Sequence, residues 1–111
     1  MKTPISQRVI EVQEKEIRQK RDSSIKATKQ NYLDAKTKLN DTMWFCFMEK
    51  VLMECEKSGK DCLTEKELNP ICDTINSVFE PAFKSLKNKY AAQIATIEKH
   101  FEEELEALVE G

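Results

Sequence analysis

The sequence predicts an all-α protein, either a long antiparallel helical hairpin or a small helical bundle with coiled-coil character. Three observations predict this class. The 111 residues include two glycines and three prolines, and charged residues (34%) nearly equal hydrophobic ones (40%), so tight turns are few and charge is abundant. Apolar residues recur at helical steps along most of the chain. A break at residues 58–62 separates two arms, 4–57 and 63–110, which we assign to one domain.

The first arm is expected to begin at Thr3 and Pro4, because threonine accepts hydrogen bonds from free amides and proline fits the first helical position. Two runs of apolar residues follow, in different phases. They are Ile5, Val9, Val12 and Ile17, then Ile25, Tyr32, Leu39, Cys46 and Met53. The phase changes near residues 21–24, and Asn40 or Asp41 could cap a new helix, so one helix or two are both compatible with this arm.

Residues 43–53 form the most apolar segment of the chain. Its apolar members are Met43, Trp44, Phe45, Cys46, Phe47, Met48, Val51, Leu52 and Met53. A helix that is apolar on all sides has no face suited to water and has to be covered by other helices. We therefore expect this segment to pack with residues 63–86 as the head of the hairpin, and to meet a second copy or a partner.

The break between the arms carries specific helix stop and start signals. Gly59 can adopt the left-handed conformation that ends a helix. Thr64 with Glu67 predicts a capping box, and Asn69 with Pro70 offers a second possible helix start. The bend is therefore expected at Gly59, with the next helix beginning at one of these two places.

The second arm has the most regular pattern, with apolar residues at steps of three and four only. They are Phe79, Phe83, Leu86, Tyr90, Ile94, Ile97, Phe101, Leu105 and Leu108. Lysine and glutamate lie between them, which is typical of a helix with one solvated face. Pro81 lies inside this pattern and predicts a kink near Val78 or Phe79.

Charge is distributed unevenly along the chain. Residues 1–40 contain ten Lys or Arg against five Asp or Glu, whereas residues 70–111 contain four against eight. Antiparallel arms would bring these opposite charges together. The alternative is that the basic run binds nucleic acid. Its members are Arg8, Lys15, Arg18, Lys20, Arg21, Lys26 and Lys29, and interleaved acids such as Glu14 and Glu16 make this the weaker interpretation.

No residues are predicted to be catalytic, cofactor-binding or metal-binding. The chain has one histidine, His100, and no glycine-rich phosphate loop, so we predict that it is not an enzyme. The cysteines are Cys46, Cys55, Cys62 and Cys72, and no two have the short spacing of zinc sites. We favour reduced thiols over two disulfides, since nine helical steps place Cys46 and Cys55 on opposite faces.

These observations favour a non-enzymatic protein–protein interaction module, such as an adaptor, assembly factor, chaperone or inhibitor. The predicted partner-binding residues are Trp44, Phe45, Phe47 and Met48, for which a role in the core is the alternative. We expect another protein as partner and a homodimer. No apolar run is long enough to span a membrane and no apolar signal segment occurs near Met1, so we expect a cytoplasmic protein.

Overall fold

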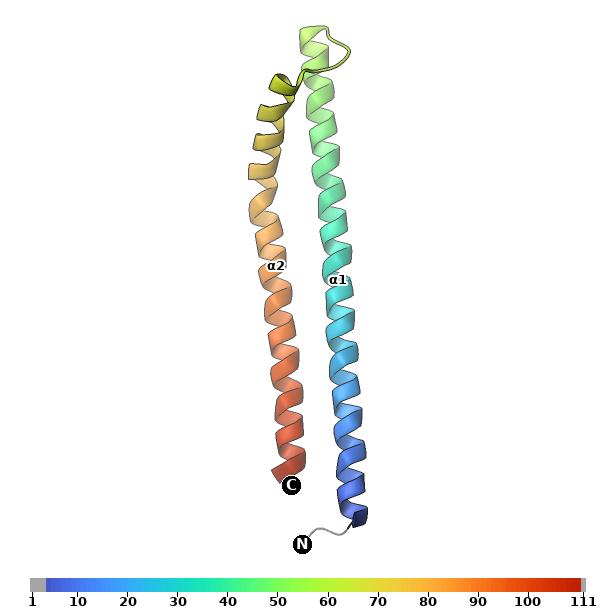
Figure 1. Ribbon diagram of the computed structural model, residues 1–111. Coiled ribbons are helices and arrows are strands. Elements are labelled where there is room, and N and C mark those ends of the chain that lie inside the picture. Colours follow the sequence, from blue (N-terminus) through green and yellow to red (C-terminus); the bar gives the residue numbers. More distant parts are fainter. Residues whose placement is uncertain (1–3, 111) are drawn as a thin grey trace. The chain divides into compact units, whose positions relative to one another are not determined.

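The computed structural model describes residues 4–110 and confirms the all-α class (Figure 1). Helix α1 spans Pro4–Ser58 and helix α2 spans Glu65–Glu110. Helix α1 continues without a break through residues 21–24 and through Asn40, so the first arm is one helix. The predicted cap at Thr3 lies outside the described residues.

Contacts divide the chain into two units. Unit 1 comprises Met1–Asn31 and Lys89–Gly111, and unit 2 comprises Tyr32–Asn88. Each unit combines a segment of α1 with a segment of α2, and unit 2 also contains the connection between the helices. The candidate site lies in unit 2.

The connection in unit 2 contains the predicted stop signal. Gly59 has a φ of 68°, in the left-handed region, and the Lys60 amide donates to the Cys55 carbonyl at 3.1 Å. This bond satisfies one of the carbonyls that the end of α1 leaves without a helical partner. The prediction that α1 ends at this glycine is confirmed.

Helix α2 begins at the first of its two predicted starts. The Glu67 amide donates to the Thr64 hydroxyl and the Thr64 amide to the Glu67 carboxylate, both at 3.3 Å, which is the reciprocal pattern of a capping box. Asn69 and Pro70 lie inside α2 and do not start it. Pro81 also lies inside α2, which continues on both sides of it.

The two helices of unit 2 face each other through half-buried apolar residues. On α1 they are Leu39, Met43, Cys46, Phe47 and Val51, and on α2 they are Leu68, Cys72, Ile75, Phe79, Phe83 and Leu86. Ile71 is 8% exposed and is the one buried hydrophobic residue among those that the structure describes. The two helices therefore contact each other along a single row of side chains, and most of the large side chains remain partly exposed to solvent.

In unit 1 the predicted apolar row of α2 faces inward, whereas that of α1 does not. Tyr90, Ile94, Ile97, Phe101, Leu105 and Leu108 are all half-buried. On α1, Val9 and Val12 are 50% and 58% exposed, while Ile10, Glu14 and Ile17 take the inner positions. Because α1 is one continuous helix, these inner residues have the same helical phase as the later apolar row through Tyr32. The prediction that Val9 and Val12 form the inner row was therefore wrong.

Candidate protein-interaction surface

Six large apolar side chains on α1 in unit 2 are exposed, and four of them lie close together. Trp44, Phe45, Met48 and Leu52 are 59%, 69%, 53% and 61% exposed. At about 100° per residue, their spacing places them on one side of the helix, and we call this set the apolar face. No charged residue occurs from 42 to 48, so the face is not interrupted along two turns. An exposed apolar patch of this kind is typical of an interaction site, whereas a helix face that only contacts solvent is usually polar.

The structure separates the four residues predicted to bind a partner. Trp44, Phe45 and Met48 belong to the apolar face, but Phe47 is half-buried and turned toward α2. The rings of Trp44 and Phe47 meet edge to face, with centroids 5.7 Å apart and an interplanar angle of 90°. Leu52 was not among the residues predicted from the sequence, although its position four residues after Met48 was the signal that could have identified it.

A groove runs beside the apolar face, between the two helices. It has a volume of about 200 Å³ and we call it the Trp44 groove. Its lining residues are Met43, Trp44 and Phe47 from α1, and Cys72, Ile75 and Asn76 from α2. Trp44 belongs to both the groove and the apolar face, so the two features form one continuous surface without charged residues.

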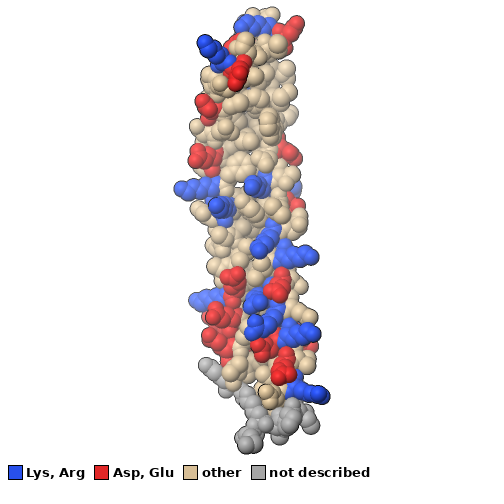
Figure 2. Space-filling model, in the orientation of Figure 1, with Lys and Arg blue, Asp and Glu red and all other residues tan. Residues whose placement is uncertain are grey.

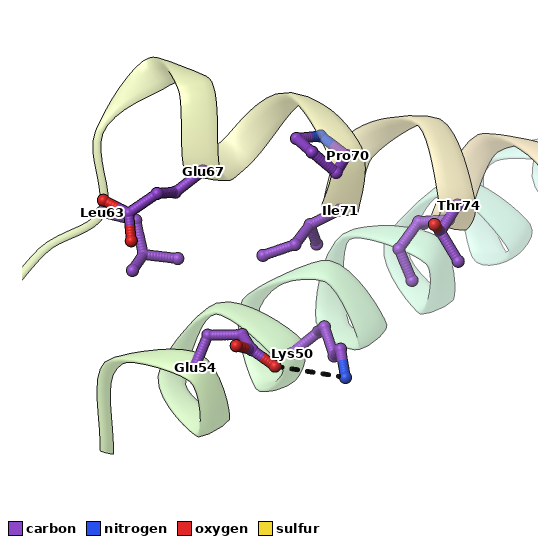
Figure 3. Close-up of a pocket in the computed structure, with 8 residues that line it drawn as sticks. Lys50, Glu54, Leu63, Glu67, Pro70, Ile71 and Thr74 are labelled. Atoms are coloured by element: carbon purple, nitrogen blue, oxygen red, sulfur yellow. Dashed lines mark ion pairs between the residues drawn. The ribbon is translucent and has the colours of Figure 1, made fainter. Parts of the chain in front are cut away.

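A second, larger groove of about 430 Å³ lies near the connection (Figure 3). We call it the Ile71 groove, because Ile71 projects from α2 toward α1 at its centre. Its other lining residues are Lys50, Glu54, Leu63, Glu67, Pro70, Thr74 and Ile75. Lys50 and Glu54 form an ion pair at 3.4 Å on the α1 side. Unlike the Trp44 groove, this groove has charged side chains along its walls.

Glu67 is the group whose ionisation the fold alters most clearly. Its carboxylate accepts hydrogen bonds from the Lys60 ammonium at 3.0 Å and from the Thr64 hydroxyl at 2.9 Å. The bond from Lys60, followed by those from Thr64, lowers the pKa of Glu67. The ionised carboxylate therefore ties the connection to the first turn of α2, which is a structural role.

The cysteines and the histidine do not come together as a site. All four cysteines are free thiols, with Cys62 exposed and the other three half-buried. His100 is in unit 1, where its side chain lies 3.4 Å from Glu104 on the same helix. Within residues 4–110, no group of three or more His, Cys, Asp or Glu side chains is placed to hold a metal ion.

Two of the basic residues of unit 1 form ion pairs with neighbouring acids. Arg18 forms an ion pair with Glu14 at 2.8 Å, and Arg21 forms one with Asp22 at 3.3 Å. On the face shown in Figure 2, lysine and arginine side chains alternate with aspartate and glutamate over this unit. A nucleic-acid backbone attracts a contiguous basic surface, which this face does not provide.

Neither helix, within the described residues, has a stretch both long and apolar enough to cross a membrane. Comparisons with models of protein families, with curated proteins and with solved structures found no match to this chain. The fold and the surface therefore define an all-α protein in which unit 2 is a helical hairpin with an exposed apolar face on α1.

Proposed function

We propose that the protein is a non-enzymatic interaction module that binds another protein through the apolar face. The observation that carries the proposal is the exposure of Trp44, Phe45, Met48 and Leu52, each more than half accessible on one side of α1. Aromatic and methionine side chains supply much of the binding free energy at protein interfaces, and helices commonly dock with residues at this spacing.

The edge-to-face contact between Trp44 and Phe47 supports the same proposal. Phe47 is held between the helices, and its ring restricts the orientations available to the neighbouring indole. A side chain that is already ordered loses less conformational entropy when a partner covers it.

Site-specific photo-crosslinking tests this function. A photoreactive phenylalanine analogue replaces Phe45 in the full chain, and the same analogue replaces Val78 as the matched control. Val78 is an apolar residue of unit 2 that is 65% exposed, but it lies on α2 outside the apolar face. We expect cross-linked protein adducts from position 45 and none of the same adducts from position 78. Identical adducts from both positions, or none from position 45, would contradict the proposal.

A further inference from the structure

We propose that the apolar face is covered by a second copy of this chain, so that two unit 2 hairpins form a symmetric four-helix dimer. This inference rests on the proposed function, because it assigns a particular partner to the same face. The interior of unit 2 is thin, because Ile71 is its one buried hydrophobic residue among those described and the facing side chains are half-buried. Four helices enclose a core that two helices cannot enclose.

The surface also has a shape that can pair with a copy of itself. The apolar face, with Met48 and Leu52, is a ridge, and the Trp44 groove lies directly beside it. A two-fold axis makes both copies use the same surface, so each must offer a projection and a matching recess side by side. In such a pair, the ridge of each copy enters the groove of the other.

The area of the apolar face reaches the lower limit for a specific interface. From the exposed fractions of its four side chains, and the roughly 150 to 250 Å² that one aromatic residue can bury, the face offers on the order of 500 Å² per copy. Two copies would together bury about 1,000 Å² through the faces alone, which is the minimum expected of a specific interface and less than the roughly 1,600 Å² of a standard one. The groove walls add to this area.

The part of the surface around Trp44 contains no charged residue. A two-fold axis brings residues near it close to their own copies, so a charge there would meet a like charge. Residues 42–48 and 51–53 contain no charged side chain; Asp41 precedes the first of these segments, and Glu49 and Lys50 separate the two. A self-pairing surface requires this distribution, whereas a surface for an unlike partner can place complementary charges at its centre.

Trp44 is the single tryptophan of the chain and provides a direct probe. The full-length chain is studied from about 0.1 to about 100 µM, a range that covers micromolar dissociation constants. Sedimentation velocity gives the mass, and acrylamide quenching of the emission gives the accessibility of the indole. We expect the mass to rise from 12.9 kDa to twice that value as quenching falls, with one concentration midpoint for both signals.

Two matched variants locate the interface. Met48→Glu places a carboxylate on the apolar face of each copy and should raise the dissociation constant at least about tenfold. Val78→Glu introduces the same charge at an exposed apolar position outside the face, and should change the dissociation constant less than about twofold. Circular dichroism at low concentration checks that both variants keep the helical content of the parent chain.

The outcomes separate this inference from the proposed function. A chain of 12.9 kDa with constant quenching over the whole range overturns the dimer. Equal weakening by Met48→Glu and Val78→Glu also overturns it, because self-association would then use another surface. If the chain is monomeric and position 45 still cross-links to a different protein, the proposed function stands without the dimer. If position 45 cross-links to nothing, both are lost.

Discussion

The indole of Trp44 lies edge to face on the phenyl ring of Phe47, with 5.7 Å between ring centroids. Three residues apart on α1, these side chains belong to different environments. Phe47 faces α2, whereas Trp44 is 59% exposed and forms part of the apolar face. The contact therefore joins the interior of unit 2 to its candidate interaction surface. It predicts that a substitution at one of the two residues alters the packing of the other.

Replacing Phe47 with alanine should lower the free energy of unfolding by about 2 kcal/mol. This is less than the roughly 3 to 5 kcal/mol of a fully buried phenylalanine, because Phe47 keeps part of its surface in solvent. Phe45→Ala, which removes the same side chain from a 69% exposed position, should cost less than about 0.5 kcal/mol. Urea unfolding at low protein concentration, where self-association does not contribute, measures the free energy of unfolding of both variants. Equal losses would contradict this assignment of inner and outer residues.

Gly59→Ala should destabilise the hairpin by about 1 kcal/mol, because an alanine at a φ of 68° adopts the left-handed conformation at a cost. A Cβ atom at this position would meet nothing within 4 Å, so the expected loss comes from the backbone alone. Gly59→Asn should lose less than the alanine variant, since asparagine tolerates this conformation better. Thermal unfolding followed by circular dichroism ranks the three proteins, and an alanine variant as stable as the parent chain would refute this reasoning.

The capping box predicts a stability difference that depends on pH. The pKa of Glu67 is lowered by Lys60 and Thr64, so the folded state favours the ionised carboxylate. This contribution is present above the ordinary glutamate pKa of roughly 4.3 and is lost as the pH falls through the lower pKa of the folded protein. The parent chain should therefore be more stable than Glu67→Gln at pH 7, and the gap should narrow on acidification.

Denaturant unfolding of both proteins across this pH range tests the effect. The same comparison is made in a Lys60→Met background, with and without Glu67→Gln. There the difference in stability should change less with pH, because the Lys60 ammonium is the largest cause of the lowered pKa of Glu67. A gap that stays constant from neutral to acidic pH would show that the carboxylate is not held as the structure indicates.

Nucleic-acid binding remains the alternative function, and the pairing of Arg18 with Glu14 and of Arg21 with Asp22 argues against it. We expect no mobility shift of duplex DNA or RNA at about 50 mM salt, where phosphate contacts are strongest. A shift that appears there and disappears by about 200 mM would favour the alternative. Lys26→Glu combined with Lys29→Glu should then abolish it, and Met48→Glu should leave it unchanged.

Much of the fold could be predicted from local residue patterns. Gly59 ends α1 and Thr64 with Glu67 starts α2, because these signals act through backbone groups a few residues away. The row from Phe79 to Leu108 faces inward as expected, since an amphipathic helix has one apolar side to bury. The sequence by itself therefore determined the all-α class, the position of the connection and the inner face of α2.

Tertiary structure decided which sides of α1 face α2. Residues 43–53 are apolar in nearly every direction, so their pattern contains no preferred side, and contact with α2 selects Phe47 as inner and Trp44, Phe45 and Met48 as outer. Near the start of α1, the phase of one continuous helix turns Val9 outward and Glu14 inward, against their hydrophobicity. In both places the position of a residue around the helix, relative to α2, decides its exposure more than its own hydrophobicity does. In unit 2 this leaves the apolar face exposed.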